Sequence, residues 1–285
     1  MPDASWNIYR YAADYLHFGG MVFGLVMIYS TRSVQGFSRK TQVLYQLVYI
    51  TRYIDVFTES QVRYLVFFKV IFNVITATML LAFAVFHHTY DVVADSCNLV
   101  AILVPTFIAA FIVASDEGLQ QELWTWSEFI EPFALVPQYI VLYRAKEVRR
   151  ISLLYVAAVG GYRLLYVCNW IYKRWTWHQA YHDYTSWIGG GLECILFFDF
   201  IFRILQKREA QDALSVSWLG KVLLDIDDSA GKLSEAVELR TIGRRLPYGL
   251  SGSATKGEEK GWDAADKLAD EEGCKLLTLS EDDNY

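Results

Sequence analysis

Charged residues are scarce in this chain of 285 residues. Asp, Glu, Lys and Arg make up 20% of it, whereas 54% of the residues are hydrophobic and 16% are aromatic. Soluble domains have about 25% charged residues, so the composition argues against a soluble globular protein. The apolar content also argues against a disordered chain, because disorder requires low hydrophobicity. The composition therefore favours an integral membrane protein.

Basic residues are not in excess, because 26 Lys and Arg stand against 32 Asp and Glu. This balance excludes a nucleic-acid binder that works through a basic patch. Residues 1–205 carry 15 basic and 15 acidic residues, whereas residues 206–285 carry 11 and 17. We therefore predict a neutral transmembrane domain at 1–205 and an acidic cytosolic tail at 206–285 that is mostly disordered.

Cysteines and metal-ligand motifs are also few. The chain has four cysteines, none in a C-x-x-C pair: Cys97, Cys168, Cys194 and Cys274. Neither a zinc site nor a disulfide framework is expected from this pattern. His178 and His182 have the i, i+4 spacing of a metal pair, but their aromatic-rich surroundings favour interfacial packing. No nucleophile–base pair stands out, so we predict that the protein is not an enzyme and has no metal or cofactor.

The apolar stretches predict how the chain crosses the membrane. The first begins near Trp6, lacks a preceding basic region and contains Arg10, Asp14 and His17, so it is expected to be retained rather than cleaved. A transmembrane helix needs about 20 mostly apolar residues. The sequence predicts an all-α integral membrane protein with seven transmembrane helices at 7–29, 42–58, 64–86, 98–115, 122–143, 151–173 and 184–205.

Basic residues between these spans predict their orientation. With the N-terminus on the luminal side, ten Lys and Arg fall on the cytosolic side and three on the opposite side. This distribution follows the positive-inside rule and places the C-terminus in the cytosol.

A faint internal repeat links the second and sixth spans. Residues Arg39–Tyr45 align with Arg149–Tyr155 at an offset of 110. The alignment predicts two parallel three-helix repeats, spans 1–3 and 5–7, joined by span 4 as a linker helix. Independent topology signals at the start of two spans would produce the same pattern.

Several ionisable residues lie inside the predicted spans, where each costs about 2.5–3.5 kcal/mol unless it has a partner or a watery cavity. Arg10, Arg52 and Lys173 lie toward the luminal half, and too few carboxylates lie at their depth to neutralise all three. An anionic ligand would satisfy them, and the planar guanidinium suits a carboxylate.

Internal pairing is the favoured interpretation for four other residues: Asp55, Arg163, Asn169 and Asp199. His17 shares one helix face with Arg10 and Asp14. With an ordinary pKa of about 6.5 it could report a pH change, or it could be an interior hydrogen-bonding residue.

Six runs of sequence together resemble the KDEL receptor family, the ER lumen protein-retaining receptors. The runs are Trp6–Arg10 with Asp14 and His17, Ser38–Leu44, Thr51–Phe57, Leu123–Thr125, Leu135–Gln138 and Tyr162–Ile171. They occur in order over about residues 6–205. The resemblance implies the seven-span fold of SWEET and PQ-loop transporters, in a multi-pass protein of the endoplasmic reticulum and Golgi membranes.

The resemblance also implies a receptor that binds C-terminal KDEL- or HDEL-like retrieval signals in the acidic Golgi and releases them in the neutral endoplasmic reticulum. Arg52 would hold the terminal carboxylate beside Tyr53, Arg10 the Glu side chain, and Lys173 the Asp side chain, with Trp170 and Asp183 in the cavity wall. His17 would sense pH. The coupling network would comprise Asp55, Glu131, Tyr162, Arg163, Asn169 and Asp199.

Two positions depart from the family pattern. Lys173 replaces an Arg, which exchanges a planar fork for a point charge. Gln121 replaces the acidic residue that faces the first signal residue, and Glu122 follows it one position, or about 100° of helix rotation, later. Altered selectivity at the first two signal positions is therefore expected.

The partners implied by the resemblance are retrieval-signal peptides, membrane lipids and coatomer, with no nucleic acid. Lys207 and Arg208 resemble the family's basic sorting tail, although a membrane-proximal basic pair is also an ordinary topology signal. The alternatives are a SWEET- or PQ-loop-like small-solute transporter, for which Pro137–Gln138 would suit a hinge, and a membrane scaffold that acts through its tail.

Overall fold

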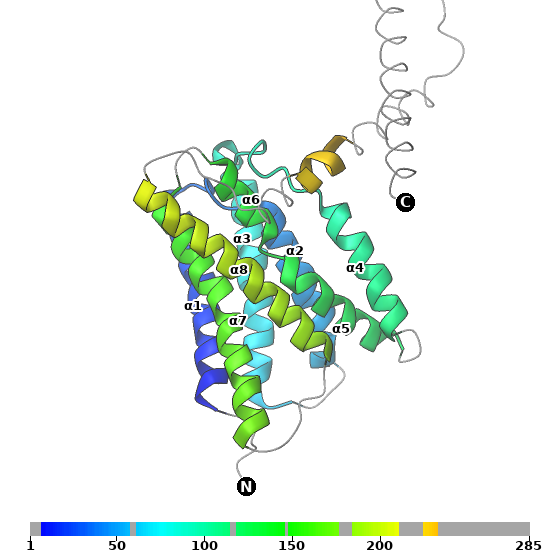
Figure 1. Cartoon of the computed structure of the whole chain (residues 1–285). Coiled ribbons are helices and arrows are strands. Elements are labelled where there is room, and N and C mark those ends of the chain that lie inside the picture. Colours follow the sequence, from blue (N-terminus) through cyan, green and yellow to red (C-terminus); the bar gives the residue numbers. More distant parts are fainter. Residues whose placement is uncertain are drawn as a thin grey trace, which may run out of the picture. The chain divides into compact units, whose positions relative to one another are not determined.

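A computed structural model describes residues 7–57, 61–114, 118–145, 148–176, 184–210 and 225–232. The chain divides into two units, Met1–Leu233 and Ser234–Tyr285, and all described residues belong to the first. The described part is helical and contains no strand (Figure 1). Its elements are α1 (Ile8–Thr31), α2 (Arg39–Arg52), η1 (Ile54–Phe57), α3 (Arg63–Val85), η2 (His87–Thr89), α4 (Leu99–Ala114), α5 (Leu119–Ile130), η3 (Glu131–Phe133), α6 (Val136–Arg144), α7 (Arg150–Thr176) and α8 (Tyr184–Ala210).

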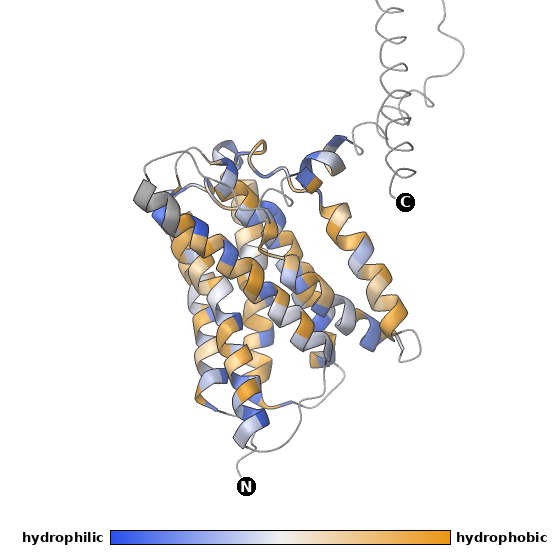
Figure 2. Ribbon diagram, in the orientation of Figure 1, coloured by the Kyte–Doolittle hydropathy of each residue, from blue (hydrophilic) through white to orange (hydrophobic). Residues whose placement is uncertain are grey.

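Three of these helices are long and apolar enough to cross a membrane: α1, α3 and α7. The shorter helix α4 is also apolar. Much of the ribbon of these helices is coloured hydrophobic in Figure 2, and many of their large apolar side chains are exposed, as expected for a protein solvated by lipid. The prediction of an all-helical membrane protein is thus confirmed for the described residues.

Local sequence explains why some helix bounds differ from the predicted spans. Helix α2 begins at Arg39 because the Ser38 side chain accepts a hydrogen bond from the Thr41 backbone N–H, and it ends at Arg52. The predicted span at 122–143 is a bent rod of α5, η3 and α6. Pro132 lies in η3 and Pro137 in the first turn of α6. Each lacks an N–H donor, so a continuous helix is interrupted there.

The bundle has two ends, which Figure 1 shows. At the N-terminal end, α1, α3, α5 and α8 begin, while α2, α4 and α7 end. We call the opposite end the tail-side end, because α8 ends there. Helices α1 and α6 also end at the tail-side end, while α2, α4 and α7 begin there. The main packing pairs are α1 with α7, α1 with α3, α2 with α3, α2 with α5, α4 with α5, α5 with α8 and α7 with α8.

Two glycines allow α1 and α7 to pack closely. A Cβ atom on Gly20 would lie 2.7 Å from the Cβ of Ala158, and one on Gly24 would lie 2.8 Å from the Tyr155 ring. Both distances are too short for non-bonded carbon atoms. Larger residues at these positions would therefore force the two helices apart.

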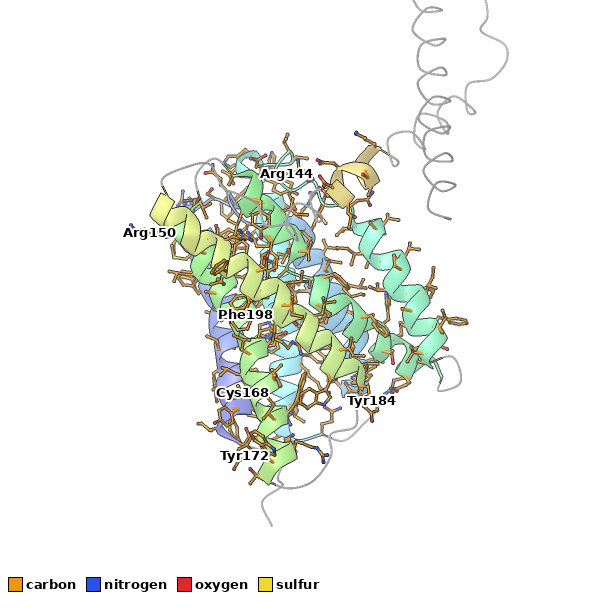
Figure 3. All side chains as sticks on the ribbon, in the orientation of Figure 1. Arg144, Arg150, Cys168, Tyr172, Tyr184 and Phe198 are labelled. Carbon is orange, nitrogen blue, oxygen red and sulfur yellow. The ribbon has the colours of Figure 1, made fainter. Side chains whose placement is uncertain are left out.

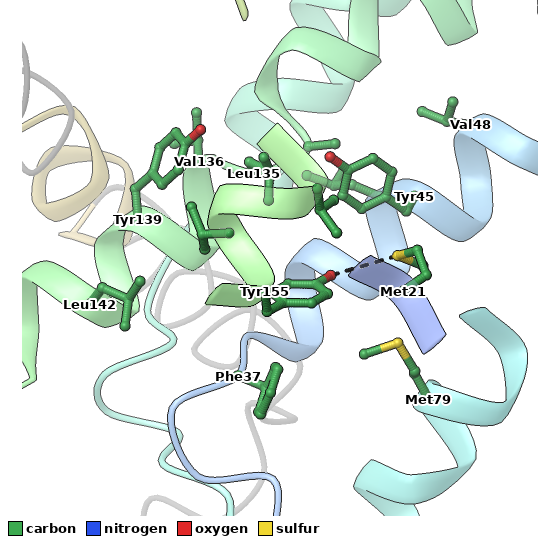
Figure 4. Packing of buried hydrophobic residues seen from close by; sticks show 14 of the residues in the cluster. Met21, Phe37, Tyr45, Val48, Met79, Leu135, Val136, Tyr139, Leu142 and Tyr155 are labelled. Carbon is green, nitrogen blue, oxygen red and sulfur yellow. Dashed lines mark hydrogen bonds between the residues drawn. The ribbon is translucent and has the colours of Figure 1, made fainter. Parts of the chain in front are cut away.

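The core behind this contact is built from buried aromatic, aliphatic and methionine side chains (Figure 4). Tyr155 is fully buried, and its hydroxyl accepts a hydrogen bond from Gln42 Nε2 at 2.7 Å and donates toward Met21 Sδ at 3.9 Å. Gln42 and Tyr155 come from the two stretches that align in the sequence, so these stretches meet in the core.

A second polar group, the Ser–Gln cluster, lies at the tail-side end and comprises Gly36, Ser38, Thr41, Asp95 and Gln138. Ser38 N donates to Gln138 Oε1 at 2.9 Å, and Gln138 N donates to Thr41 Oγ1 at 3.0 Å. Gln138 Nε2 donates to the Gly36 carbonyl at 2.8 Å, and Ser38 Oγ donates to Asp95 Oδ1 at 2.7 Å. Gly36 has a φ of +84°, which a side chain would disfavour. The cluster fixes α6 against the start of α2.

Candidate functional site

A cavity of about 270 Å³ lies in the N-terminal half of the bundle, between α1, α2, α3, α5, α7 and α8. We call it the central cavity. Figure 3 shows the side chains of the bundle, with Tyr172 labelled near the end of α7 and Tyr184 at the start of α8. Its lining comprises Arg10, Asp14, His17, Arg52, Tyr53, Leu65, Phe68, Lys69, Phe72, Glu128, Tyr162, Arg163, Tyr166, Asn169, Trp170, Lys173 and Ser186.

The three cations predicted to meet a ligand, Arg10, Arg52 and Lys173, all line this one cavity. They come from the start of α1, the end of α2 and the last turn of α7. Residues more than 120 positions apart are thus brought together by the packing of α1 on α7 and of α2 on α5.

Arg52 has an acidic partner, although the sequence predicted too few carboxylates nearby to neutralise all three cations. Arg52 Nη1 forms an ion pair with Glu131 Oε2 at 2.7 Å, and Arg52 Nε donates to Ser127 Oγ at 2.9 Å. The bend at η3 turns Glu131 into the bundle, which the sequence pattern did not reveal. Arg52 Nη2 is buried and has no hydrogen-bond partner among the described residues.

Glu131 is the centre of a buried charge network. Its carboxylate also pairs with Arg163 Nη2 and accepts a hydrogen bond from the Tyr162 hydroxyl at 2.7 Å. Arg163 Nε donates to Glu193 Oε2 at 2.6 Å. Two guanidinium groups are therefore balanced by two carboxylates, of which Glu131 is 6% exposed and Glu193 1% exposed. Such a network is stable only when its members remain paired, because an unpaired buried charge is costly.

Asp14 is held by tyrosine hydroxyls. Tyr166 donates to Asp14 Oδ1, and Tyr64 donates to Asp14 Oδ2 at 3.0 Å. Helices α1 and α7 are also joined by Asn169, whose side-chain oxygen accepts a hydrogen bond from Asn7 Nδ2 at 2.5 Å. Asn7 is the N-cap of α1, so this bond joins the first turn of α1 to α7.

His17 lies between two aromatic rings at the inner end of the cavity. Its ring stacks on Tyr162 with a centroid distance of 4.0 Å and on Phe72 with one of 4.5 Å. His17 Nε2 is 2.9 Å from the Tyr49 hydroxyl, and only 5% of the residue is exposed. The imidazole thus has one polar partner and is otherwise enclosed by rings.

Two charged residues in the lining were not singled out in the sequence. Lys69 donates to Asp55 Oδ2 at 2.5 Å and to Gln61 Oε1 at 2.7 Å, and lies over the Tyr53 ring. Its position inside the predicted third span was the signal that could have revealed it. Glu128, one turn before Glu131, accepts hydrogen bonds from hydroxyls at the start of α8.

The cavity lining carries more cationic than acidic side chains. Five cationic side chains face the cavity, but only two carboxylates do, those of Asp14 and Glu128. The other acidic partners stand behind the lining, where they pair with lining cations: Asp55, Glu131 and Glu193. A ligand in the cavity therefore contacts a lining with an excess of positive charge.

Other predicted site residues do not line the cavity. Glu122 lies in the first turn of α5, and Asp199 lies on α8 six residues beyond Glu193, toward the tail-side end. Asp183 falls outside the described residues, as do His178, His182 and the side chains of Lys207 and Arg208. Among the described residues there is no group of three or more His, Cys, Asp or Glu that could hold a metal ion.

Comparison with known proteins then identifies the family. A family model described as "ER lumen protein retaining receptor" matches residues 33–173. ER lumen protein-retaining receptors of Entamoeba histolytica and Drosophila melanogaster are 32% and 33% identical to this chain, over 204 and 202 residues. These alignments cover 71% and 70% of this chain and 95% and 94% of the relatives. This chain belongs to the ER lumen protein-retaining receptor family.

The family assignment agrees with the resemblance seen in the sequence. A third relative, "ER lumen protein-retaining receptor erd-2.1" of Caenorhabditis elegans, is 32% identical over 207 residues, which is 71% of this chain and 96% of the relative. By name, the ER lumen protein-retaining receptors are receptors rather than enzymes. The region matched by the family model includes Arg52, Glu131, Arg163 and Lys173 and ends before the tail.

Proposed function

We propose that this protein binds the C-terminal KDEL- or HDEL-like retrieval signals of luminal proteins and returns those proteins from the Golgi to the endoplasmic reticulum. The observation that carries the proposal is the cationic lining of the central cavity in a chain of this family. A retrieval tail ends in two acidic side chains and a free carboxylate. The solute-transporter alternative is not favoured, because the relatives are named as receptors.

Arg52 holds the terminal carboxylate in this proposal. Its Nη1 is committed to Glu131, but its buried Nη2 has no hydrogen-bond partner among the described residues and can donate to a new oxygen. If a bound carboxylate also takes Nη1, Glu131 keeps Arg163 and the Tyr162 hydroxyl as partners. Binding therefore exchanges partners within the network without leaving a carboxylate unpaired.

Arg10 and Lys173 take the two acidic side chains of the signal. Both line the cavity, beside the wall formed by Trp170 and Tyr53. Lys173 offers an ammonium group on a flexible stem, so it selects Asp less strictly than a bidentate guanidinium would. Gln121 and Glu122 lie outside the cavity lining in this conformation, so weak selection at the first signal residue is part of the proposal.

His17 makes binding depend on pH. The charged groups that interact with it are Glu131, Arg163 and Arg52, all members of the charge network. Protonation of His17 adds a positive charge at the inner end of the cavity, where its Nε2 lies 2.9 Å from the Tyr49 hydroxyl. If binding of an acidic peptide takes up this proton, affinity is highest at acidic pH and falls as the pH rises.

The complete proposal is a protein with seven spans: α1, α2 with η1, α3, α4, the bent rod α5–η3–α6, α7 and α8. The packing supports two repeats joined by α4, because the main contacts of the two repeats match. Within the repeats, α1–α3 corresponds to α5–α8 and α2–α3 to α7–α8; between the repeats, α1–α7 corresponds to α5–α2. The N-terminal end of the bundle is luminal, by the distribution of Lys and Arg.

The remaining partners complete the cycle. The apolar outward faces of the helices contact membrane lipids, and the tail at 206–285, with Lys207 and Arg208, recruits coatomer for return to the endoplasmic reticulum. Asp183 belongs to the cavity wall, and Asp55, Asn169 and Asp199 support the charge network.

A peptide titration tests the function. The full-length protein in detergent is titrated with a peptide ending in Lys-Asp-Glu-Leu and with the same peptide carrying a C-terminal amide, at acidic and at neutral pH. The free acid is expected to bind, more tightly at acidic pH, whereas the amide loses the charge-assisted bonds to Arg52, worth about 1.5–3 kcal/mol. Equal binding of the acid and the amide would contradict the assignment of Arg52.

A further inference from the structure

Residues 225–232 form a short helical segment that contacts the tail-side end of the bundle. The segment carries three aspartates, at 225, 227 and 228, and belongs to the same unit of the chain as the bundle. It lies beside the end of α6, where Figure 3 labels Arg144. Asp227 is only 6% exposed, although acidic residues of a hydrophilic segment are normally solvated.

Three donors from the bundle surround the Asp227 carboxylate. Asn98 N donates to Asp227 Oδ1 at 2.8 Å, and Ser96 Oγ donates to Oδ2 at 2.5 Å. Arg144 Nη2 donates to the same Oδ2 at 3.2 Å. The backbone donor belongs to the residue before α4, where the helix dipole favours negative charge. The site therefore combines a backbone N–H, a hydroxyl and a guanidinium around one carboxylate.

Two further bonds fix the segment in one register. Arg144 Nη2 also donates to Asp228 Oδ1 at 2.5 Å, and Asn98 Nδ2 donates to the Ala230 carbonyl at 3.1 Å. Asp225, two residues before Asp227, is exposed. The contact thus depends on position within the segment and not on acidic composition alone.

We infer that residues 225–232 are an intramolecular latch, in which Asp227 occupies a carboxylate-binding site built by Ser96, Asn98 and Arg144. The site lies inside the region matched by the family model, residues 33–173, whereas the latch lies beyond it. The latch bridges two elements, because Asn98 precedes α4 and Arg144 ends α6. A movement that separates these two ends breaks the bonds to Asp227 and frees the tail.

Cys97 is a natural reporter of the latch, because it lies between two of the residues that bind Asp227. It is 5% exposed. Burial, with a contribution from the Asp227 carboxylate, raises the pKa of the Cys97 thiol to about 12. Only the thiolate reacts with maleimides, so alkylation is slow while the latch is closed. Release of the latch removes the neighbouring negative charge, which lowers the pKa of the thiol.

The test uses the full-length protein in detergent, with Cys168, Cys194 and Cys274 replaced by Ser so that maleimide labels Cys97 alone. Asp227→Ala is expected to increase the alkylation rate about tenfold or more, as a fall of one pKa unit would alone produce. Asp225→Ala, on the same segment, is the matched control and should leave the rate unchanged. Equal rates for the parent and Asp227→Ala would overturn the latch.

A second variant keeps the test valid if Asp227→Ala does not yield monodisperse protein. Arg144→Gln removes one of the three donors, so the alkylation rate should rise in the same direction by a smaller factor. An unchanged rate for a monodisperse Arg144→Gln variant would also overturn the latch.

Coupling to the central cavity rests on the proposed function and has a separate readout. Saturating retrieval peptide should change the Cys97 alkylation rate in the parent but not in Asp227→Ala. If the peptide binds and the parent rate stays the same, the coupling is refuted and the proposed function stands. If the peptide does not bind at all, the proposed function fails, whereas the comparison of Asp227→Ala with Asp225→Ala still decides the latch.

Discussion

Two buried polar networks lie in different parts of the bundle and differ in charge. The network around Glu131 shares one carboxylate between Arg52 and Arg163 and borders a cavity. The Ser–Gln cluster pairs uncharged groups of Ser38, Thr41 and Gln138 within the core, with Asp95 at its edge. The first arrangement can change partners when an anion arrives, whereas the second fixes two helices. Polar groups are buried in both networks. The binding site differs because it has hydrogen-bond donors in excess of acceptors and lies next to a cavity.

The largest expected effect follows from removing the shared carboxylate. Glu131→Gln leaves Arg52 and Arg163 without full compensation, which should destabilise the protein by about 3–5 kcal/mol. A strongly lowered midpoint of thermal unfolding in detergent would show this. Glu122→Gln, in the first turn of α5 and outside the cavity lining, is the control and should change stability by less than about 0.5 kcal/mol. Similar midpoints for the two variants would contradict the central role of Glu131.

Breaking the Ser–Gln cluster should affect stability alone. Gln138→Leu leaves the Ser38 N–H without its acceptor, at a cost of about 1–3 kcal/mol. Because the cluster lies away from the cavity, the folded fraction should bind retrieval peptide with unchanged affinity. A loss of affinity larger than the loss of stability would mean that the two networks are coupled.

The pH dependence should be removed by a substitution that preserves the stacking of rings. His17→Phe keeps an aromatic ring between Phe72 and Tyr162 but cannot take up a proton. The protein with His17 is expected to lose affinity for the retrieval peptide as the pH rises. The loss is at most about tenfold per pH unit if one proton is linked to binding. The variant should show a flat profile between acidic and neutral pH. The same slope in both proteins would assign the proton to another group.

The smallest effect is expected from restoring a planar cation at the cavity wall. Lys173→Arg should improve discrimination between peptides with Asp and Asn at the second signal position by about 0.5–1 kcal/mol, because a guanidinium binds a carboxylate bidentately. Competition between the two peptides measures the difference. Unchanged discrimination would show that Lys173 does not contact this side chain.

Much of the fold follows from hydropathy, because a long apolar run has few alternatives to a membrane-spanning helix. The predicted spans at 7–29, 64–86 and 151–173 lie within or close to α1, α3 and α7. The span predicted at 42–58 overlaps α2 and η1 but differs in its bounds, because the Ser38 cap starts α2 at Arg39 and the α-helix ends at Arg52. The bend at η3 was also missed, although its two prolines are visible in the sequence.

The sequence predicted several residues of the site but not the ion pairs between them. Intramembrane charge alone singled out Arg10, Arg52 and Lys173, which line one cavity, and their roles in binding stay predictions. The Arg52–Glu131 pair could not be foreseen, because it depends on how η3 rotates one helix against another. Lys69 was overlooked because its neighbours in the third span are strongly apolar.

The close contact of α1 and α7 has a consequence for how the protein could change shape. At Gly20 and Gly24 the side chains of α7 leave no room for even one additional carbon atom on α1, so these helices are expected to behave as a single stiff wall. Any widening that admits a bulky polypeptide terminus would then fall to the helices across from that wall, chiefly α2, α5 and α8. The lack of a side chain at Gly20 and Gly24 would in this way determine which helices stay fixed and which helices move.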